Sequence, residues 1–198
     1  VGAGTIAATG DGTASGLYEL GLEVIKTVSG KGFPVIKPWV GDGILKKIRL
    51  AEDAGVSAVG IDVDGAVLVN RYGGGIIAEP KTKDKIAQLA QSTNLPLIIK
   101  GIMNPEDAEA SYQAGVKAIV VSNHGGRVID GVPGTAEVLP EVVKRVKGKL
   151  KILVDGGIRS GADVLKMLAL GADAVLVGRP MIIACYGGGA EGVAFTLN

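Results

Sequence analysis

The only histidine of the chain lies in a short polar run that contains residue types suited to proton transfer and anion binding. The run, SNHGGR, covers residues 122–127 and follows the apolar segment AIVV. A neutral imidazole accepts a proton near neutral pH, so His124 at the end of a strand can serve as a general base. Arg127 adds a guanidinium group that fits a substrate carboxylate. A solitary histidine is often structural, but its polar neighbours here favour catalysis.

Two further charged residues follow apolar runs and are candidates for the same site. Asp62 ends VGID and Lys100 ends PLIIK. A carboxylate beside an imidazole fixes its tautomer and stabilises the imidazolium, so Asp62 is the expected partner of His124, with Asp64 as a nearby competitor. A lysine that follows four apolar residues needs an anionic or electron-rich partner unless it reaches solvent. We therefore expect Lys100 to face the reacting centre.

Two glycine-containing segments with arginines predict a phosphate site. DGGIRSG at 155–161 and VGRP at 177–180 both follow apolar runs. Their glycines leave backbone N–H groups accessible, and phosphate sites after the last strands are common in barrels. The alternative is that the glycines only form tight turns and the arginines are solvated. The cofactor-binding candidates in these segments are Asp155, Gly156, Gly157, Arg159, Gly178 and Arg179.

These residues need a scaffold that brings the ends of several strands together. Helical segments that begin after Asp42, Asn104 and Ser160 separate the apolar runs. Buried strands that alternate with helices indicate a parallel sheet, whose active site lies at the carboxyl ends of the strands. The sequence predicts strands at 34–37, 58–62, 96–100, 118–122, 151–155 and 174–178, with a candidate seventh at 4–10.

This alternation of strands and helices fits both an open doubly wound sheet and a (β/α)8 TIM barrel. A complete barrel typically takes about 250 residues, whereas the chain has 198. Val1 is not an initiator methionine, and no signal-peptide pattern follows it. We therefore expect one domain over residues 1–198, with the first βα unit missing from this sequence and supplied by a preceding segment.

The composition restricts the classes of partner. Lysine and arginine total 21 against 20 for aspartate and glutamate, so no excess of charge suggests nucleic acid. No apolar stretch approaches the roughly 20 residues of a membrane span. With one histidine and one cysteine, Cys185, neither an internal disulfide nor a zinc site of the usual type is expected. We expect a cytoplasmic homo-oligomer with a small-molecule partner, bound to neither nucleic acid nor membrane.

Two long segments together resemble a known family of flavoproteins. IIKGIMNPEDAEASYQAGVKAIVVSNHGGRVIDGVPGTAEVLPEV and DGGIRSGADVLKMLALGADAVLVGRP are similar to the FMN-dependent α-hydroxy-acid oxidases and dehydrogenases, which include lactate oxidase and glycolate oxidase. The match is dense over residues 96–180 and looser before them. The resemblance implies a (β/α)8 barrel, FMN as cofactor, and oxidation of a small 2-hydroxy acid to the 2-oxo acid.

The resemblance also implies a role for each matching residue. His124 is the expected base, oriented by Asp62, and Arg127 is expected to bind the substrate carboxylate. Lys100 is expected beside the flavin, where its charge offsets the charge that develops on the ring, and Ser122 is expected to contact the same cofactor. The candidates in the two glycine-containing segments are expected to hold the ribityl chain and phosphate.

Several positions differ from the family pattern. Asp62 matches the family's aspartate that pairs with the histidine. The family has a proline two residues after this aspartate and a substrate-binding arginine seven residues after it, but this chain has Asp64 and Val69 at those positions. On the strand before the one that ends in Asp62, the family has a glutamine and a tyrosine for flavin and substrate, but FPVIKPW at 33–39 contains neither. Arg71 is a candidate to replace the lost arginine, and Lys37 is a candidate to replace the glutamine or the tyrosine. These differences keep two alternatives open: another FMN-barrel enzyme, such as type 2 isopentenyl diphosphate isomerase, and a non-catalytic flavin- or phosphate-binding protein.

Overall fold

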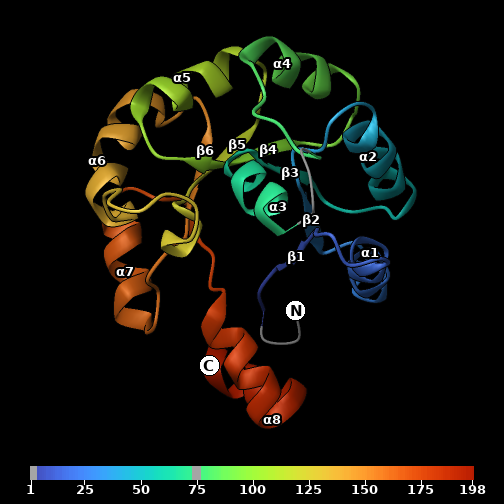
Figure 1. Cartoon of the computed structure of the whole chain (residues 1–198). Coiled ribbons are helices and arrows are strands. Elements are labelled where there is room, and N and C mark those ends of the chain that lie inside the picture. Colours follow the sequence, from blue (N-terminus) through green and yellow to red (C-terminus); the bar gives the residue numbers. More distant parts are fainter. Residues whose placement is uncertain (1–3, 73–76) are drawn as a thin grey trace.

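The described part of the chain is organised around one curled parallel sheet. The computed structural model describes residues 4–72 and 77–198, so Val1 lies outside it. The strands pair in their order along the chain, and Figure 1 shows that the sheet forms an arc. The strands are β1 (Ala7–Gly10), β2 (Gly32–Ile36), β3 (Val59–Asp62), β4 (Leu97–Ile102), β5 (Ala118–Val121), β6 (Lys151–Val154) and β7 (Ala174–Val175).

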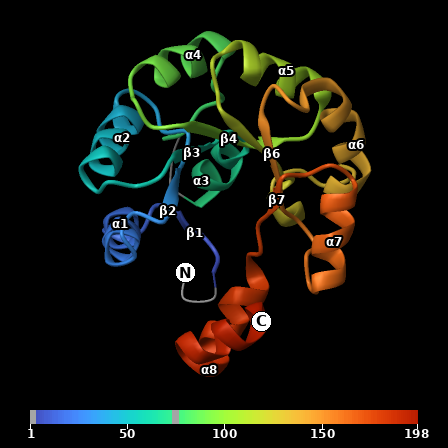
Figure 2. The same ribbon diagram turned by 180° about the vertical axis from the view of Figure 1, so that it is seen from behind.

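The helices that connect these strands cover the outer side of the arc (Figures 1 and 2). They are α1 (Leu17–Thr27), α2 (Gly43–Asp53), α4 (Lys83–Gln91), α5 (Pro105–Gln113), α6 (Thr135–Val146) and α7 (Gly161–Ala169). The short helix α3 (Ala66–Tyr72) lies on the inner side, and α8 (Arg179–Leu197) extends away from the end of the sheet. Two 3-10 turns, η1 (Val63–Gly65) and η2 (His124–Gly126), follow β3 and β5.

The predicted helix starts are confirmed, and side chains stabilise two of them. The Asn104 side chain accepts the Asp107 backbone N–H at the start of α5, at 2.7 Å. Ser160 and Asp163 form a reciprocal capping box at the start of α7. Such bonds satisfy N–H groups that the first turn leaves without a helical partner. Asp42 precedes α2 as predicted, but among the described residues its side chain accepts no capping bond.

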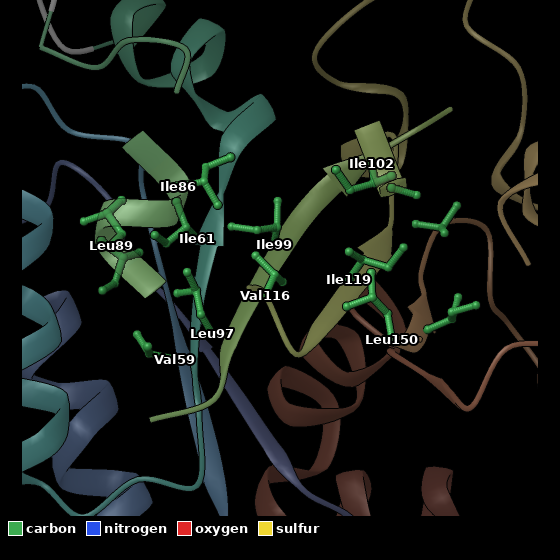
Figure 3. Packing of buried hydrophobic residues seen from close by; sticks show 14 of the residues in the cluster. Val59, Ile61, Ile86, Leu89, Leu97, Ile99, Ile102, Val116, Ile119 and Leu150 are labelled. Carbon is green, nitrogen blue, oxygen red and sulfur yellow. The ribbon is translucent and has the colours of Figure 1, made fainter. Parts of the chain in front are cut away.

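The core fills the space between the sheet and the outer helices. Every residue of β3 and β5 is buried, as expected for inner strands of a parallel sheet that is covered on both faces. Figure 3 shows Ile61, Ile99 and Ile119 pointing into one cluster with Leu89 of α4. Burial of each such side chain contributes about 1.5–3 kcal/mol, so the core holds the strand ends in a fixed relative position.

The order of the strands distinguishes between the two architectures that the spacing left open. A doubly wound sheet reverses its strand order near the middle, whereas here each strand lies beside its successor from β1 to β7. The six predicted strands and the candidate at 4–10 are all present, although β7 is shorter than the predicted 174–178. The described residues therefore form a curled α/β half-barrel, and this much of the predicted barrel is confirmed.

The helix α8 differs from the other helices because it buries none of its described residues. Ile183, Tyr186 and Phe195 are exposed, and the helix is interrupted at Gly188 and Gly189. None of the helices in residues 4–72 and 77–198 combines the length and the apolar character needed to cross a membrane.

Candidate active site

The carboxyl ends of five neighbouring strands bring the predicted charged residues together. Lys37 follows β2, Asp62 ends β3, Lys100 lies in β4, His124 follows β5 and Asp155 follows β6. The parallel register places Asp62 directly beside Lys100. Residues that are up to 118 positions apart therefore form one cluster at this edge of the sheet.

The turn η2 holds His124 in a conformation that non-glycine residues rarely adopt. Its φ is 56°, in the left-handed region, and such strain costs about 1–3 kcal/mol and is concentrated at functional sites. The backbone N–H of His124 donates to Oγ of buried Ser122 at 3.1 Å, and Asn123 Oδ1 accepts the Gly126 N–H at 3.2 Å. These bonds fix the backbone of the turn that carries the imidazole.

The imidazole faces two carboxyl groups instead of the one that was predicted. Nδ1 of His124 lies 3.0 Å from Oδ1 of Asp64 and 3.4 Å from Oδ1 of Asp62. The predicted pairing with Asp62 is present, but Asp64 is the nearer partner. Because the carboxyl groups lie at Nδ1, the nitrogen that remains to take up a proton is Nε2.

Asp62 also binds two lysines, one on each carboxylate oxygen. Lys37 Nζ donates to Oδ2, and Lys100 Nζ donates to Oδ1 at 3.2 Å. Lys100 Nζ also lies 3.8 Å from a carboxylate oxygen of Asp155. Lys100 therefore faces anionic groups, as predicted, and Lys37 belongs to the same cluster.

These contacts shift the pKa values of the two carboxyl groups beside His124. Burial alone would raise the pKa of Asp62, but hydrogen bonds with His124 and Asp64 and the charges of the two lysines hold it well below its usual range. Burial raises the pKa of Asp64, with a further contribution from neighbouring Asp62, although the bond with His124 acts in the opposite direction. Asp62 is therefore the carboxylate that stays ionised.

His124 and Lys100 of the cluster both have raised pKa values. Burial would lower the pKa of His124, but its hydrogen bonds with Asp62 and Asp64 raise it above the usual value. Burial would also lower the pKa of Lys100, and the charges of Asp62 and Asp155 raise it instead. Lys100 thus carries a positive charge beside the histidine at neutral pH.

A cavity beside this cluster is lined by nearly all of the predicted site residues. Of these, only Asp62 and Ser122 are absent from the lining that the described residues form. Ser122 is fully buried and supports the turn at His124, so its contact with a cofactor stays a prediction. The predicted residues in the lining are Lys100, His124, Arg127, Asp155, Gly156, Gly157, Arg159, Gly178 and Arg179.

The arginines and glycines occupy one part of this cavity. Gly156 and Gly157 have φ values of 95° and 76°, and a Cβ atom on Gly157 would meet nothing within 4 Å, so its backbone is open to a ligand. Each arginine donates to a backbone carbonyl at 2.8–3.3 Å: Arg127 to His124, Arg159 to Ile158, and Arg179 to Gly125. Their remaining N–H donors and their charge suit a phosphate group.

An unpaired acceptor provides a test of whether the cavity fits FMN. Oδ1 of Asp155 is buried and has no hydrogen-bond partner among the described residues. A buried carboxylate oxygen without a donor needs one, and the hydroxyl groups of a ribityl chain are donors. The orphaned oxygen of Asp155, together with the arginines and the open glycine backbone, fits the sugar-alcohol and phosphate parts of FMN.

A cation fits the charged cluster less well. Asp62, Asp64 and His124 place one donor atom each within 4.8 Å of the others. However, the two oxygens of Asp62 already accept from Lys37 and Lys100, and a metal ion would have to displace these ammonium groups. The cluster is therefore better explained as a hydrogen-bonded set of charges.

Sequence reasoning missed Asp11, whose carboxyl group is buried at the end of β1. It accepts hydrogen bonds from the Lys37 backbone N–H at 3.2 Å, from Trp39 Nε1 at 2.6 Å and from Lys47 Nζ at 3.1 Å. These bonds hold the segment that carries Lys37. The signal was a carboxylate directly after the candidate strand at 4–10, a position similar to that of Asp62 at the end of its strand.

Of the two altered family positions, Asp64 lies at the site, 3.0 Å from Nδ1 of His124, whereas Val69 is not among the described residues that line the cavity. Val69 is buried against Ala66 and Ala78, so no charged group replaces the expected arginine at that place. Arg71 lies exposed in the last turn of α3. Its role as a replacement for the lost arginine stays a prediction.

The fold and the site together define a class of protein. A curled parallel α/β sheet that carries a histidine base candidate beside a candidate phosphate-binding loop is typical of cofactor-dependent enzymes. Residues 71–198 match the family model described as FMN-dependent dehydrogenase. The chain therefore belongs to the FMN-dependent dehydrogenase family, and FMN is the cofactor of that family.

Individual proteins support this assignment. The 2-hydroxyacid oxidase of Dictyostelium discoideum is 47% identical over 137 residues, which are 69% of this chain and 35% of that protein. The L-lactate dehydrogenase of Xanthomonas campestris pv. campestris is 58% identical over 98 residues, which are 50% of this chain and 25% of that protein. A crystal structure of mandelate oxidase with (S)-2-phenylpropionate superimposes with a TM-score of 0.80 at 36% identity, and covers 99% of this chain and 62% of that one. The chain thus spans about a quarter to two thirds of the length of these proteins.

Proposed function

We propose that the protein is an FMN-dependent oxidoreductase that converts a small 2-hydroxy acid into the 2-oxo acid. The observation that carries this proposal is the position of His124 in one cavity with Arg127, Lys100 and the glycine and arginine residues of the phosphate loop. The names of the relatives, which include 2-hydroxyacid oxidase and L-lactate dehydrogenase, agree with this reaction.

Each residue at the site has a separate role in this reaction. The hydroxy acid loses two electrons and two protons, and Nε2 of His124 takes one of these protons while Asp62 stabilises the imidazolium that results. Arg127 binds the carboxylate and thereby holds the hydroxyl-bearing carbon in place. When bound, FMN supplies the acceptor for the two electrons and for the other proton. Lys100, with its raised pKa, provides positive charge where negative charge develops.

The same proposal extends to the cofactor contacts and to the complete architecture. Arg159, Arg179 and Gly178, with Gly156 and Gly157, are proposed to hold the phosphate, and Asp155 the ribityl hydroxyls. The curled sheet is proposed to be part of a (β/α)8 barrel. Its sequential strand order and its likeness to a mandelate oxidase that is longer than this chain support this view.

The experiment that tests this function is anaerobic reduction of bound flavin. The protein is loaded with FMN and its visible absorption is recorded before and after addition of L-lactate, glycolate or an isoprenoid diphosphate. The proposal expects bleaching with a hydroxy acid. Bleaching with the diphosphate alone would assign another FMN reaction, and binding of FMN without reduction by any of the compounds would indicate a non-catalytic flavoprotein.

A further inference from the structure

The two carboxyl groups at Nδ1 of His124 have unequal surroundings. Nδ1 carries at most one proton and therefore donates one full hydrogen bond, yet Oδ1 of Asp64 lies 3.0 Å away and Oδ1 of Asp62 lies 3.4 Å away. Two buried carboxylates that face one donor repel each other, and they cannot both ionise without a large cost. One of them is therefore expected to hold a proton.

The lysines decide which carboxyl group keeps its negative charge. Asp62 accepts from Lys37 and from Lys100, one on each oxygen. Among the described residues, Asp64 forms no ion pair with a lysine or an arginine, and its Oδ2 is buried without a hydrogen-bond partner. An unpaired buried oxygen is far less costly on a neutral carboxylic acid than on a carboxylate.

The backbone of β4 closes over Asp64 and limits the access of water. The register of β4 shifts at Gly101, where φ is 108°. A Cβ atom at this position would lie 2.8 Å from Cγ of Asp64. The side chain of Asp64 is accordingly only 14% exposed, so little solvent remains to stabilise a second negative charge.

The other charged groups around His124 come from neighbouring elements. Lys37 after β2, Lys100 in β4 and Asp155 after β6 complete the cluster. Arg127 and Arg179 donate to backbone carbonyls of η2, not to the two carboxyl groups. The raised pKa of Asp64, which arises from burial and from neighbouring Asp62, agrees in direction with this geometry.

We propose that Asp64 is a positioning residue for His124, and that it shares a proton with Asp62 so that the pair presents a single negative charge to Nδ1. This inference rests on the proposed role of His124 as the base. One negative charge stabilises the imidazolium that forms in the reaction. Two would hold His124 protonated before substrate arrives and so remove the base. The shared proton keeps Nδ1–H directed at the carboxyl pair and leaves Nε2 free.

The test uses the fact that His124 is the only histidine of the chain, so its NMR signals need no separation from others. The FMN-loaded protein is labelled with 15N-histidine and with 13Cγ-aspartate, and the Asp64 signal is identified by its loss in Asp64→Asn. The proposal expects Asp64 to be protonated at pH 7, with His124 in the Nδ1–H tautomer once it is neutral. An ionised Asp64 at that pH overturns the proposal.

Three variants separate the two carboxyl groups. Asp62→Asn should lower the pKa of His124 by at least about 1 unit, a tenfold change in proton affinity, because the negative charge is lost. Asp64→Asn should shift that pKa by less than about half a unit, because a neutral amide replaces a neutral acid. Asp64→Ala should raise the population of the Nε2–H tautomer, and Asp64→Asn should retain the Nδ1–H form. Equal effects of the two asparagine variants, or an unchanged tautomer in Asp64→Ala, refute the proposal.

Two features keep this test decisive. If Asp64→Ala fails to fold, as judged by its NMR dispersion, the carboxyl signal of the unaltered protein and the two asparagine variants still decide the outcome. All measurements are made without substrate. A protein that oxidises no hydroxy acid refutes the proposed function alone, whereas an active protein with an ionised Asp64 refutes only the role of Asp64.

Discussion

At the scale of single residues, His124 is surrounded by groups of both charges. Asp62 and Asp64 lie within 3.4 Å of Nδ1, and Lys100 binds the same oxygen of Asp62. The carboxyl groups favour the imidazolium, whereas the lysine and burial oppose it, and the carboxyl groups prevail because the pKa of His124 is raised. The histidine is therefore a stronger base than a free imidazole.

Under the proposed function, replacement of His124 is expected to stop substrate oxidation without loss of the cofactor. His124→Gln removes the proton acceptor, and loss of a general base costs about 10²–10⁴ in rate. The arginines of the phosphate loop are untouched, so FMN should stay bound. Stopped-flow flavin reduction measures the first effect and fluorescence titration with FMN the second. Reduction at nearly the original rate would remove His124 from the mechanism.

The raised pKa of His124 has a defined effect on the pH dependence of the rate. Because the base acts only when neutral, kcat/KM should increase with pH through a midpoint above the ordinary histidine value of about 6.5. Asp62→Asn should move this midpoint to lower pH, since the carboxylate that stabilises the imidazolium is lost. A pH profile of each protein measures both midpoints, and an unshifted midpoint in the variant would contradict the pairing.

The raised pKa of His124 also makes the stability of the fold depend on pH. A pKa that is higher in the folded state stabilises the fold fully below the unfolded value of about 6.5, and this contribution disappears as pH rises through the folded pKa. Asp64, whose pKa is also raised, contributes a slope of the same sign. Urea unfolding should show that the free energy of unfolding declines between about pH 6 and 9, and that the decline is shallower in His124→Gln. An equal slope in that variant would mean that the pKa of His124 is the same in the folded and the unfolded state.

At the proposed phosphate site, a reversal of one charge is expected to abolish FMN binding. Arg179 lies at the start of α8 and borders the cavity, so Arg179→Glu replaces an attraction to the dianion by a repulsion. Lys166→Glu, on α7 outside the cavity lining, gives the same change in net charge as a control. Fluorescence titration with FMN compares the two, and equal affinity would show that the phosphate lies elsewhere.

At the scale of secondary-structure elements, the irregularity in β4 connects the strand to the site. The shift in register at Gly101 allows the backbone to lie against Asp64 of η1. A bulge of this kind changes the direction of the strand end. Lys100 and Ile102 are two positions apart in the strand, yet Lys100 belongs to the site and Ile102 is buried in the core. The position of Asp64 thus depends on the backbone of another strand.

Substitution of this glycine is expected to disturb both stability and the site. Gly101→Ala introduces a Cβ atom at a φ of 108° and only 2.8 Å from Cγ of Asp64. Gly115→Ala, at a φ of 85° with nothing within 4 Å of its Cβ, is the matched control for backbone strain alone, which costs about 1–2 kcal/mol. Gly101→Ala should cost about 1–3 kcal/mol more. Urea unfolding gives both values, and equal losses would mean that the clash is relieved.

At the scale of the whole molecule, the curvature of the sheet gathers the ends of its strands. In a flat sheet the ends of β2 and β6 would be separated by the width of the three strands between them, about 19 Å over four strand spacings. In the arc of Figure 1 these ends surround a common centre. There Lys37 and Lys100 both bind Asp62, and Lys100 also lies 3.8 Å from Asp155. The site is therefore a property of the curled sheet and not of a single strand pair.

A cofactor bound at this centre is expected to stabilise the molecule as a whole. FMN at 100 times its dissociation constant adds about 2.7 kcal/mol, which raises the melting temperature of a domain of this size by roughly 5–10 °C. Riboflavin lacks the phosphate and should have a much smaller effect at the same concentration. Differential scanning fluorimetry with the two flavins measures the difference, and equal shifts would exclude the arginine loop as the anchor.

Local patterns in the sequence account for the elements and for most of the cavity lining. Apolar runs and capping residues such as Asn104 and Ser160 act within a few positions, so the strands and helices follow from short segments of the chain. A polar residue at or just after the carboxyl end of a buried parallel strand lies where the active site of such folds is found, which is why the sequence predicts Lys100, His124 and Asp155 in one site. The phosphate-loop residues follow from the same rule.

Which charged groups are nearest neighbours within the site depends on the tertiary structure. The preference of His124 for Asp64, the second lysine on Asp62 and the support of Lys37 by Asp11 depend on side-chain directions across strands that are distant in sequence. The two carboxyl partners differ by only a few tenths of an ångström in their distance from Nδ1 of His124, which is 3.0 Å for Asp64 and 3.4 Å for Asp62. Strand register, the bulge at Gly101 and the strained turn at His124 set these distances, and none of them has a local pattern in the sequence.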